Sequence, residues 1–212
     1  MWLRSQGFEV DLAPVARGGF VDMERLADLI RPDTSLVYSR AANTEIGSNQ
    51  PIEDISALLE KHPTVSFHVD AVQAIGKMPL ADFLTDRVDF ATFSGHKFHS
   101  VRGVGFIFAK EGKKISPLLT GGGQESDKRS TTENLAGIAA TAKALRLVLD
   151  QFEAGQKRLL AMKKVILDEL ATYPDVTIFS QMEDFLPNIL TFGIKNVRGE
   201  VTVHAFEDHQ IY

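Results

Sequence analysis

The sequence predicts an α/β fold with a mostly parallel sheet covered by helices, followed by the start of a second, α+β unit. Short apolar runs alternate with amphipathic stretches along the first part of the chain, which is the order that such sheets require. Glycine-rich or polar segments follow several of the apolar runs, and loops of this kind often hold functional sites. The 212 residues, 44% of them hydrophobic, suffice for one sizeable core with a small appendage.

The first part of the chain supplies the sheet and its nearest helices. Asp22 precedes MERLADLI (23–30), whose apolar residues recur at helical spacing, so Asp22 is expected to cap this helix. Pro32 ends it, and Pro51 opens a second helix that reaches about Leu59. The strands of this part are expected at 8–12, 35–39, 65–69, 88–93 and 103–109.

From about Glu133 the pattern changes to longer helices. Residues 133–152 and 157–171 have helical periodicity, and Gly155 is a possible break between them. Two strands (176–179 and 188–194) and a helix (199–208) are expected to follow. This part therefore predicts the second, α+β unit.

Composition excludes several classes of protein. The net charge is −5, and no stretch is basic enough for a nucleic-acid groove, so small molecules or proteins are the expected partners. The absence of cysteine removes disulfides, thiolate metal sites and a cysteine nucleophile from this chain, and the six histidines have no metal-ligand spacing. No apolar run approaches the ~18 residues of a membrane span and no signal peptide is recognisable, so we expect a cytoplasmic protein.

The segment HVDAVQAIGK (68–77) contains the first candidate site residue. Asp70 lies at the carboxyl end of an expected strand, where open α/β sheets place their ligands. A carboxylate there can hold a cationic ring nitrogen, and Gln73 points the same way if a helical turn follows. The alternative is that Asp70 caps the following helix, and this segment by itself favours that role.

The segment SGHKFHSVRGVG (94–105) places a lysine in a glycine-containing turn after an apolar strand. If Lys97 is partly desolvated there, its pKa is lowered and its amine can form a Schiff base with an aldehyde cofactor. Ser94 and His96 can donate hydrogen bonds to a phosphate. The alternative is a surface turn with a solvated lysine, which the usual exposure of lysine favours.

Two further loops are candidates. TGGGQESDKRSTTEN (120–134) can approach an anion closely through its glycines and Thr132, or it is a flexible connector in which Thr132 caps a helix. AANTEIGSNQPI (41–52) carries Asn43 and Thr44 on another loop after a strand, where Asx-turn chemistry explains the same residues without a ligand.

Taken in order, these segments resemble the class V, fold-type I enzymes that use pyridoxal 5'-phosphate (PLP), and most closely the NifS/IscS-type cysteine desulfurases. The resemblance rests on NTEIGSNQPI, HVDAVQAIGK, VDFATFSGHK and GGGQESDKRSTTENLAGI. It implies a three-layer sandwich with a mostly parallel sheet as a partial large domain (1–150), then a connecting helix and the beginning of a small domain (151–212). The implied activity is sulfur transfer from L-cysteine to a protein acceptor, giving L-alanine, as in iron–sulfur cluster assembly.

The resemblance also implies residue roles. Lys97 would form the Schiff base with PLP and move protons on the substrate carbon, and Asp70 would pair with the pyridinium nitrogen. Gln73 would hydrogen-bond the phenolic oxygen of the ring. Ser94 and His96 would bind the phosphate.

Three other residues are expected to reach the cofactor. Thr132 would contact the phosphate of a neighbouring subunit, which implies a homodimer with shared sites. The family has two adjacent asparagines before the glutamate, and the second contacts the cofactor. Asn43 matches the first, and Thr44 replaces the second.

The resemblance further implies that this chain is truncated at both ends. The family's amino-terminal phosphate-binding segment, its persulfide-forming cysteine and its substrate-binding arginine lie outside these 212 residues, so the chain alone is expected to be inactive. The alternatives are another class V enzyme, such as a selenocysteine lyase or a small amino-acid aminotransferase, and a non-catalytic remnant that serves as a dimerisation or binding module.

Overall fold

The computed structural model describes residues 2–211, and the chain divides into two compact units. The terminal unit comprises Met1–Leu29, Ala42–Gln50 and Glu153–Tyr212. The sheet unit comprises Ile30–Ala41 and Pro51–Phe152. Both units are assembled from separate stretches of the chain, and the domain division expected at residue 150 stays a prediction.

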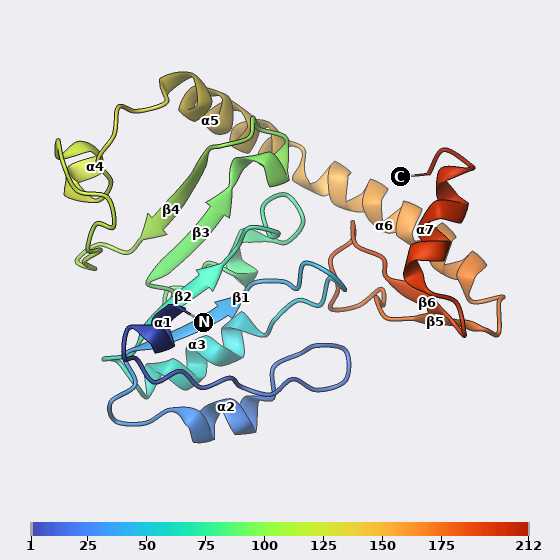
Figure 1. Ribbon diagram of the computed structural model, residues 1–212, viewed down its shortest axis with the longest axis horizontal. Helices are drawn as coiled ribbons and strands as arrows, with labels where there is room; N and C mark the ends of the chain where they lie inside the picture. Colours follow the sequence, from blue (N-terminus) through green and yellow to red (C-terminus); the bar gives the residue numbers. More distant parts are fainter. Residues whose placement is uncertain (1, 212) are drawn as a thin grey trace. The chain divides into compact units, whose positions relative to one another are not determined.

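The sheet unit is built on four strands that lie side by side in sequence order (Figure 1). They are β1 (Leu36–Arg40), β2 (Ser66–Asp70), β3 (Phe90–Ser94) and β4 (Gly105–Ala109). The pairs β1–β2 and β2–β3 are parallel, whereas β3 and β4 are antiparallel. This arrangement confirms the predicted α/β class with a mostly parallel sheet.

One face of this sheet is buried and the other is half-exposed. Phe67 and Val69 of β2 are fully buried, whereas His68 and Asp70 beside them are only half-buried. β3 repeats this alternation, because successive side chains of a strand point to opposite faces. The core of the unit also contains apolar residues of α3 (Ile52–Glu60) and of the loops, among them Ile52, Ile55, Leu59, Phe83, Val88 and Phe98. The polar residues of β2 and β3, Asp70 included, therefore lie on the open face.

The helix α5 (Leu135–Asp150) begins later than expected and has a different cap. The side-chain oxygen of Asn134 accepts a hydrogen bond from the backbone amide of Gly137 at 3.0 Å. The alternative in which Thr132 caps this helix is therefore wrong, and the helix begins two residues after the expected start at about Glu133. Asparagine is a strong N-cap residue, and here it satisfies one of the amides that the first helical turn leaves without a partner.

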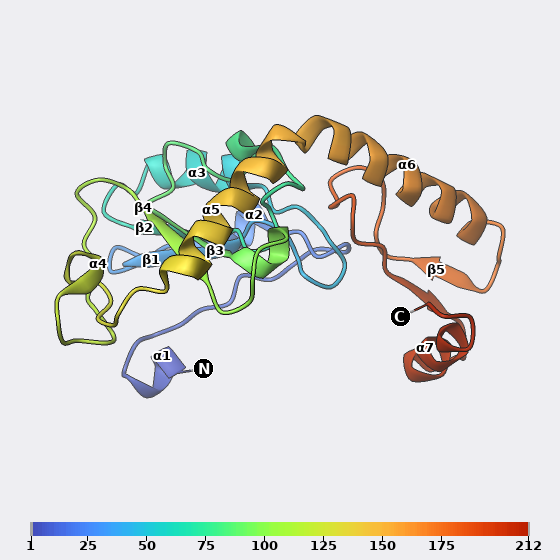
Figure 2. The ribbon, with the colours of Figure 1, turned by 90° about the horizontal axis from the view of Figure 1, so that it is seen from above.

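The terminal unit combines helices with a two-stranded antiparallel sheet, as expected for an α+β unit (Figure 2). Its elements are α1 (Trp2–Ser5), α2 (Met23–Leu29), α6 (Phe152–Leu170), β5 (Val176–Ile178), β6 (Phe192–Ile194) and α7 (Gly199–Glu207). The predicted cap of α2 is confirmed, because Asp22 Oδ1 accepts a hydrogen bond from the Arg25 amide at 3.0 Å. Among residues 2–211, no helix is both long enough and apolar enough to cross a membrane.

Two predictions for this unit are wrong. Residues 8–12 form no strand, because no neighbouring segment pairs with them, and Phe8 and Leu12 are exposed. The break between the two long helices falls at Gln151 and not at Gly155, which lies inside α6. A single glycine costs a helix only about 1 kcal/mol, which the rest of a 19-residue helix can offset.

Candidate functional site

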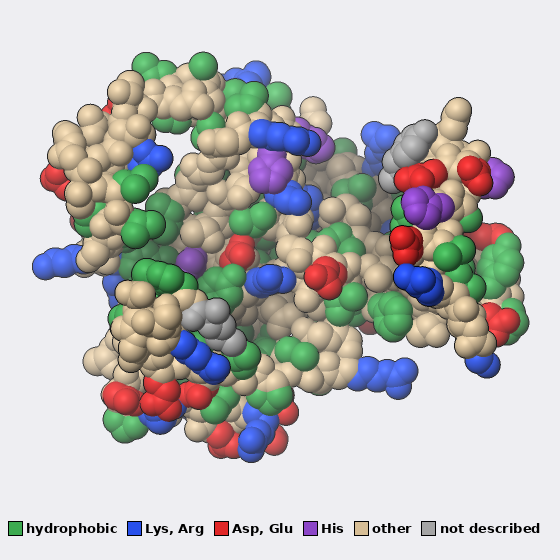
Figure 3. Space-filling model, viewed as in Figure 1, with side chains coloured by type: hydrophobic (Ala, Val, Ile, Leu, Met, Phe, Trp, Pro, Cys, Tyr) green, Lys and Arg blue, Asp and Glu red, His purple; other side chains and the backbone are tan. Residues whose placement is uncertain are grey.

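The parallel strands bring four predicted site residues to one edge of the sheet. Asp70 ends β2 and Ser94 ends β3. A 3₁₀ helix, η2 (Gly95–Phe98), follows β3 directly and carries His96 and Lys97. Because parallel strands end at the same edge, these side chains share the edge at which open α/β sheets bind their ligands. Histidine and basic side chains gather on the surface over this region in Figure 3.

Asp70 is held by two hydrogen bonds. Its Oδ2 accepts from the Tyr38 hydroxyl at 3.0 Å, and its Oδ1 accepts from the backbone amide of Val72 at 3.1 Å. The second bond is an Asx turn, and residues 72–77 continue as turns rather than as a regular helix, so the helix-capping alternative is wrong. Gln73 lies half-buried in these turns.

An aromatic pair on the open face of the sheet was not predicted. The ring of Tyr38 meets that of His68 edge to face at 5.4 Å, and His68 Nε2 lies 3.2 Å from the Thr92 hydroxyl. Burial raises the pKa of Tyr38, and its hydrogen bond to Asp70 raises it further. Burial also lowers the pKa of His68, although the nearby charge of Asp70 opposes this. Both rings are therefore favoured in their neutral forms beside the carboxylate.

The turn that carries Lys97 is fixed by its backbone. The Gly95 amide donates to the carbonyl of Val104 at 2.9 Å, and the Ser100 amide donates back to the carbonyl of Gly95 at 3.1 Å. A Cβ atom on Gly95 would lie 3.0 Å from the Val104 carbonyl oxygen and 3.1 Å from Thr141 Oγ1, so the position has room for little more than glycine. The side chain of Lys97 therefore starts from a well-defined backbone.

Lys97 is exposed, so the partial desolvation that we considered for it is absent, and its environment is that of the solvated alternative. The lysine that burial affects at this edge is Lys77, which sequence reasoning did not single out. Burial, and then the positive charge of Lys97, lower the pKa of Lys77 to about 8. An exposed Lys97 is reachable by an aldehyde from solution, which partial burial would hinder.

The glycine-rich loop lies on the surface of the sheet unit. Thr132 is exposed, and the Ser130 amide donates to the carbonyl of Leu119 at 3.1 Å. The guanidinium of Arg129 donates to the backbone carbonyl of the next residue at 3.2 Å. Thr132 is thus available to an external group, and its predicted contact with a phosphate stays a prediction.

Asn43 and Thr44 belong to the terminal unit, in a loop that Asn43 itself organises. The side-chain oxygen of Asn43 accepts hydrogen bonds from the amides of Glu45, at 2.8 Å, and Ile46, at 3.1 Å. This is the Asx turn that we considered as the alternative to ligand binding. Thr44 is exposed in the same turn. The cofactor roles of both residues stay predictions.

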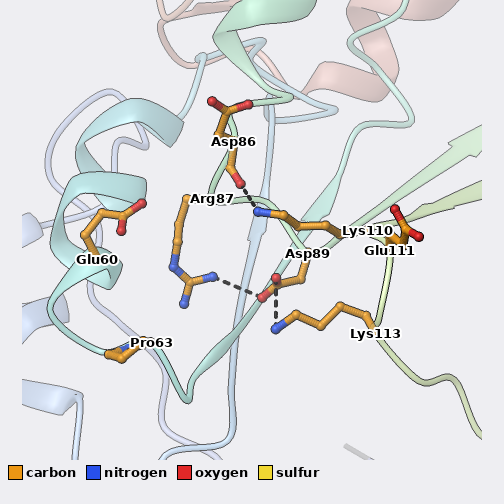
Figure 4. A pocket seen from close by; sticks show the side chains of 8 residues that line it. All are labelled: Glu60, Pro63, Asp86, Arg87, Asp89, Lys110, Glu111 and Lys113. Atoms are coloured by element: carbon orange, nitrogen blue, oxygen red, sulfur yellow. Dashed lines mark hydrogen bonds and ion pairs between the residues drawn. The ribbon is translucent and has the colours of Figure 1, made fainter.

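A second charged cluster lies at the opposite edge of the sheet (Figure 4). Asp89 directly precedes β3, and its carboxylate lies 3.0 Å from both Arg87 Nη1 and Lys113 Nζ. It also accepts a hydrogen bond from the Phe67 amide at 2.9 Å. Burial opposes ionisation of Asp89, but the Phe67 amide, Lys113 and Arg87 together lower its pKa. Arg87, Asp89 and Lys113 line a pocket of about 270 Å³. Because both carboxylate oxygens of Asp89 are already paired, we assign this cluster a structural role.

The sequence profile of the family described as aminotransferase class-V matches residues 2–212. The chain belongs to this family. A relative in Lactobacillus delbrueckii subsp. bulgaricus, named NifS/IcsS protein homolog, is 46% identical over 99% of this chain and 55% of its own length. Cysteine desulfurase IscS of Dictyoglomus turgidum is 37% identical over 94% of this chain and 50% of its own length. The chain thus spans about half the length of the curated relatives it matches.

Solved structures show the same likeness. A NifS-like protein superposes with a TM-score of 0.93 at 36% identity, over all of this chain and 57% of its own. A NifS-like protein from Rickettsia africae superposes with a TM-score of 0.87 at 30% identity, over 94% of this chain and 56% of its own. SspA, solved in complex with cysteine, superposes with a TM-score of 0.76 at 27% identity, over 98% of this chain and 56% of its own. The fold is that of NifS-like class-V proteins, which confirms the resemblance found in the sequence.

Proposed function

We propose that Lys97 binds PLP covalently and that the intact protein is a cysteine desulfurase. Such an enzyme converts L-cysteine and a protein thiol into L-alanine and a protein persulfide, so that one sulfur atom moves to the acceptor. The observation that carries the proposal is the exposed amine of Lys97 on a fixed turn, at the sheet edge that also holds the carboxylate of Asp70. Membership of the class-V family supports the assignment.

The residues at this edge fit PLP chemically. The cofactor needs an amine for its aldehyde, an anion for its ring nitrogen and hydrogen-bond donors for its phosphate. Each carboxylate oxygen of Asp70 accepts one hydrogen bond from the protein. A carboxylate has about four acceptor positions in all, so capacity remains for a cationic ring nitrogen. Bound PLP supplies an electron sink for the negative charge that develops on the substrate carbon.

Lys97 and Asp70 have distinct roles in this proposal. The carboxylate of Asp70, held in place by Tyr38 and the Val72 amide, would favour a proton on the ring nitrogen by its negative charge. The amine of Lys97 would also serve as the base that takes a proton from the substrate carbon and the acid that returns it. Ser94 and His96 are proposed to hold the phosphate as hydrogen-bond donors.

The remaining predicted residues complete the proposal. Gln73 would donate to the phenolic oxygen of the ring. Thr44, whose turn is shaped by Asn43, is proposed to contact the cofactor. Thr132 would reach the phosphate of a second subunit, so the proposed assembly is a homodimer. The exposure of Thr132 supports this contact.

L-cysteine as substrate is supported by the relatives. Several are named cysteine desulfurases, and the similar SspA was solved in complex with cysteine. The 212 residues contain no cysteine, so in the proposed reaction the thiol that accepts the sulfur is not among them.

Borohydride trapping tests the proposal. The chain is incubated with PLP, reduced with sodium borohydride, digested and mapped by mass spectrometry. We expect the phosphopyridoxyl label on the peptide that contains Lys97, and we expect it to disappear in Lys97→Arg and to persist in Lys110→Met. A label on another lysine, or one spread evenly over the surface lysines, would overturn the assignment.

A further inference from the structure

Lys77 closes the segment HVDAVQAIGK, and its ammonium group contacts the backbone of Lys97. Lys77 Nζ donates a hydrogen bond to the Lys97 carbonyl at 2.5 Å and lies 3.5 Å from the carbonyl of Ile75. The contact joins the turns after β2 to η2, two segments that are 20 residues apart in sequence. It therefore connects the two segments that carry Asp70 and Lys97.

The backbone of Lys77 is anchored by its neighbours. The amides of Lys77 and Met78 both donate to the Ala74 carbonyl at 2.9 Å, and Met78 is buried. Gly76 has a φ of +73°, and a Cβ atom there would lie 2.4 Å from Val148 Cγ2, so this turn passes very close to α5. The side chain of Lys77 thus leaves from a position that can shift little.

The carbonyl of Lys97 receives a partner that its own turn does not supply. The amides of His99 and Ser100, which follow η2, both donate back to the carbonyl of Gly95. The ammonium of Lys77 therefore fills the place of a backbone donor. Because its pKa is about 8, this group carries its charge at neutral pH, and a charged donor makes a stronger hydrogen bond than a neutral one.

We propose that Lys77 is a positioning residue for Lys97. Its ammonium ties the Lys97 carbonyl to the turns after β2, and so fixes the direction in which the Lys97 side chain leaves η2. The proposal rests on the proposed function, because it assumes that Lys97 is the lysine that binds PLP. Lys77 itself touches neither cofactor nor substrate in this account.

Three variants of the whole chain distinguish loss of the Lys77 hydrogen bond from other effects of the substitution. Lys77→Met removes the donor and keeps the long stem, whereas Lys77→Arg keeps a charged donor. Lys110→Met is the matched control, because Lys110 also donates its ammonium to a distant backbone carbonyl, that of Asp86 at the opposite edge of the sheet.

The first readout is amide hydrogen exchange in the cofactor-free chain. We expect Lys77→Met to raise exchange at His99 and Ser100 about tenfold, since a charged hydrogen bond that fixes the turn is lost. Lys77→Arg and Lys110→Met should exchange as the wild type does. Equal exchange in all four proteins would overturn the proposal.

The second readout is the amount of PLP that borohydride traps on Lys97 at a fixed, subsaturating PLP concentration. We expect about a tenfold loss in Lys77→Met, recovery in Lys77→Arg and no change in Lys110→Met. Undiminished labelling of Lys97 in Lys77→Met would overturn the positioning role. If the wild type is not labelled at Lys97, the proposed function fails, while the exchange measurement still decides whether Lys77 holds the turn.

Discussion

Two lysines at one edge of the sheet differ in their exposure to solvent. Lys97 is exposed, whereas Lys77 is half-buried and has a lowered pKa. The sequence pattern placed Lys97 correctly after a strand but left its environment open between partial burial and exposure, because burial depends on residues that are distant in sequence. His68 and Tyr38 were missed, although strand periodicity could have found them. His68 lies two residues before Asp70 and thus on the same face, and Tyr38 pairs with His68 across β1 and β2.

The buried carboxylate of Asp89 leads to a stability prediction at the residue scale. Its side chain is 3% exposed, so Asp89→Asn leaves Arg87 without its ionic partner in a buried position. We expect a loss of about 3 kcal/mol in the free energy of unfolding at pH 7, measured by urea denaturation. Asp168→Asn, which removes the exposed partner of Lys164, serves as the control and should change stability very little.

The pH dependence of this loss follows from the direction of the pKa shift. The pKa of Asp89 is lowered in the folded state, so its contribution is fully present above the unfolded value of about 4. The contribution is lost as the pH falls through the folded value. The stability difference between wild type and Asp89→Asn should therefore be constant from pH 7 to about 5 and shrink below about 4. A difference that persists unchanged at pH 3 would contradict the role of the ionised carboxylate.

At the element scale, the predicted strands and helices are correct where the local sequence pattern determines them. They are wrong where an element depends on partners that are distant in the sequence. The four strands of the sheet unit begin within two residues of their predicted positions, because each is a short apolar run that is visible in the sequence. The segment 8–12 has a similar pattern but finds no partner strand. The start of α5 depended on which of several polar residues caps it, and Asn134 does so.

The close approach of Gly76 to α5 gives a prediction for that contact. Gly76→Ala introduces strain from the positive φ and an overlap with Val148. Gly103→Ala is the matched control, because Gly103 has a similar φ of +84° and no atom within 4 Å of a new Cβ. We expect Gly76→Ala to lower the free energy of unfolding by about 1–3 kcal/mol more than Gly103→Ala does. Equal losses of unfolding free energy in the two variants, measured by thermal or urea denaturation, would show that α5 moves to accommodate the new methyl group without a loss of stability.

At the scale of the whole molecule, the terminal unit joins segments that are far apart in the sequence. The loop 42–50 is held by residues near the carboxyl end. Ser180 Oγ donates to the Ile46 carbonyl at 2.5 Å, and the Leu186 amide donates to the Gly47 carbonyl at 2.7 Å. The first of these contacts joins residues that are 134 positions apart, so no local sequence pattern predicts it. The homodimer and the cytoplasmic location stay predictions at this scale.

The visible absorption spectrum tests the central claim most directly. The purified chain, Lys97→Ala and Lys110→Ala are each mixed with PLP and desalted, and circular dichroism confirms that all three are folded. The account predicts a retained visible band in the wild type and in Lys110→Ala, and its loss in Lys97→Ala. An undiminished band in Lys97→Ala, or the absence of a band in the folded wild type, would contradict the claim that Lys97 binds the cofactor in this chain.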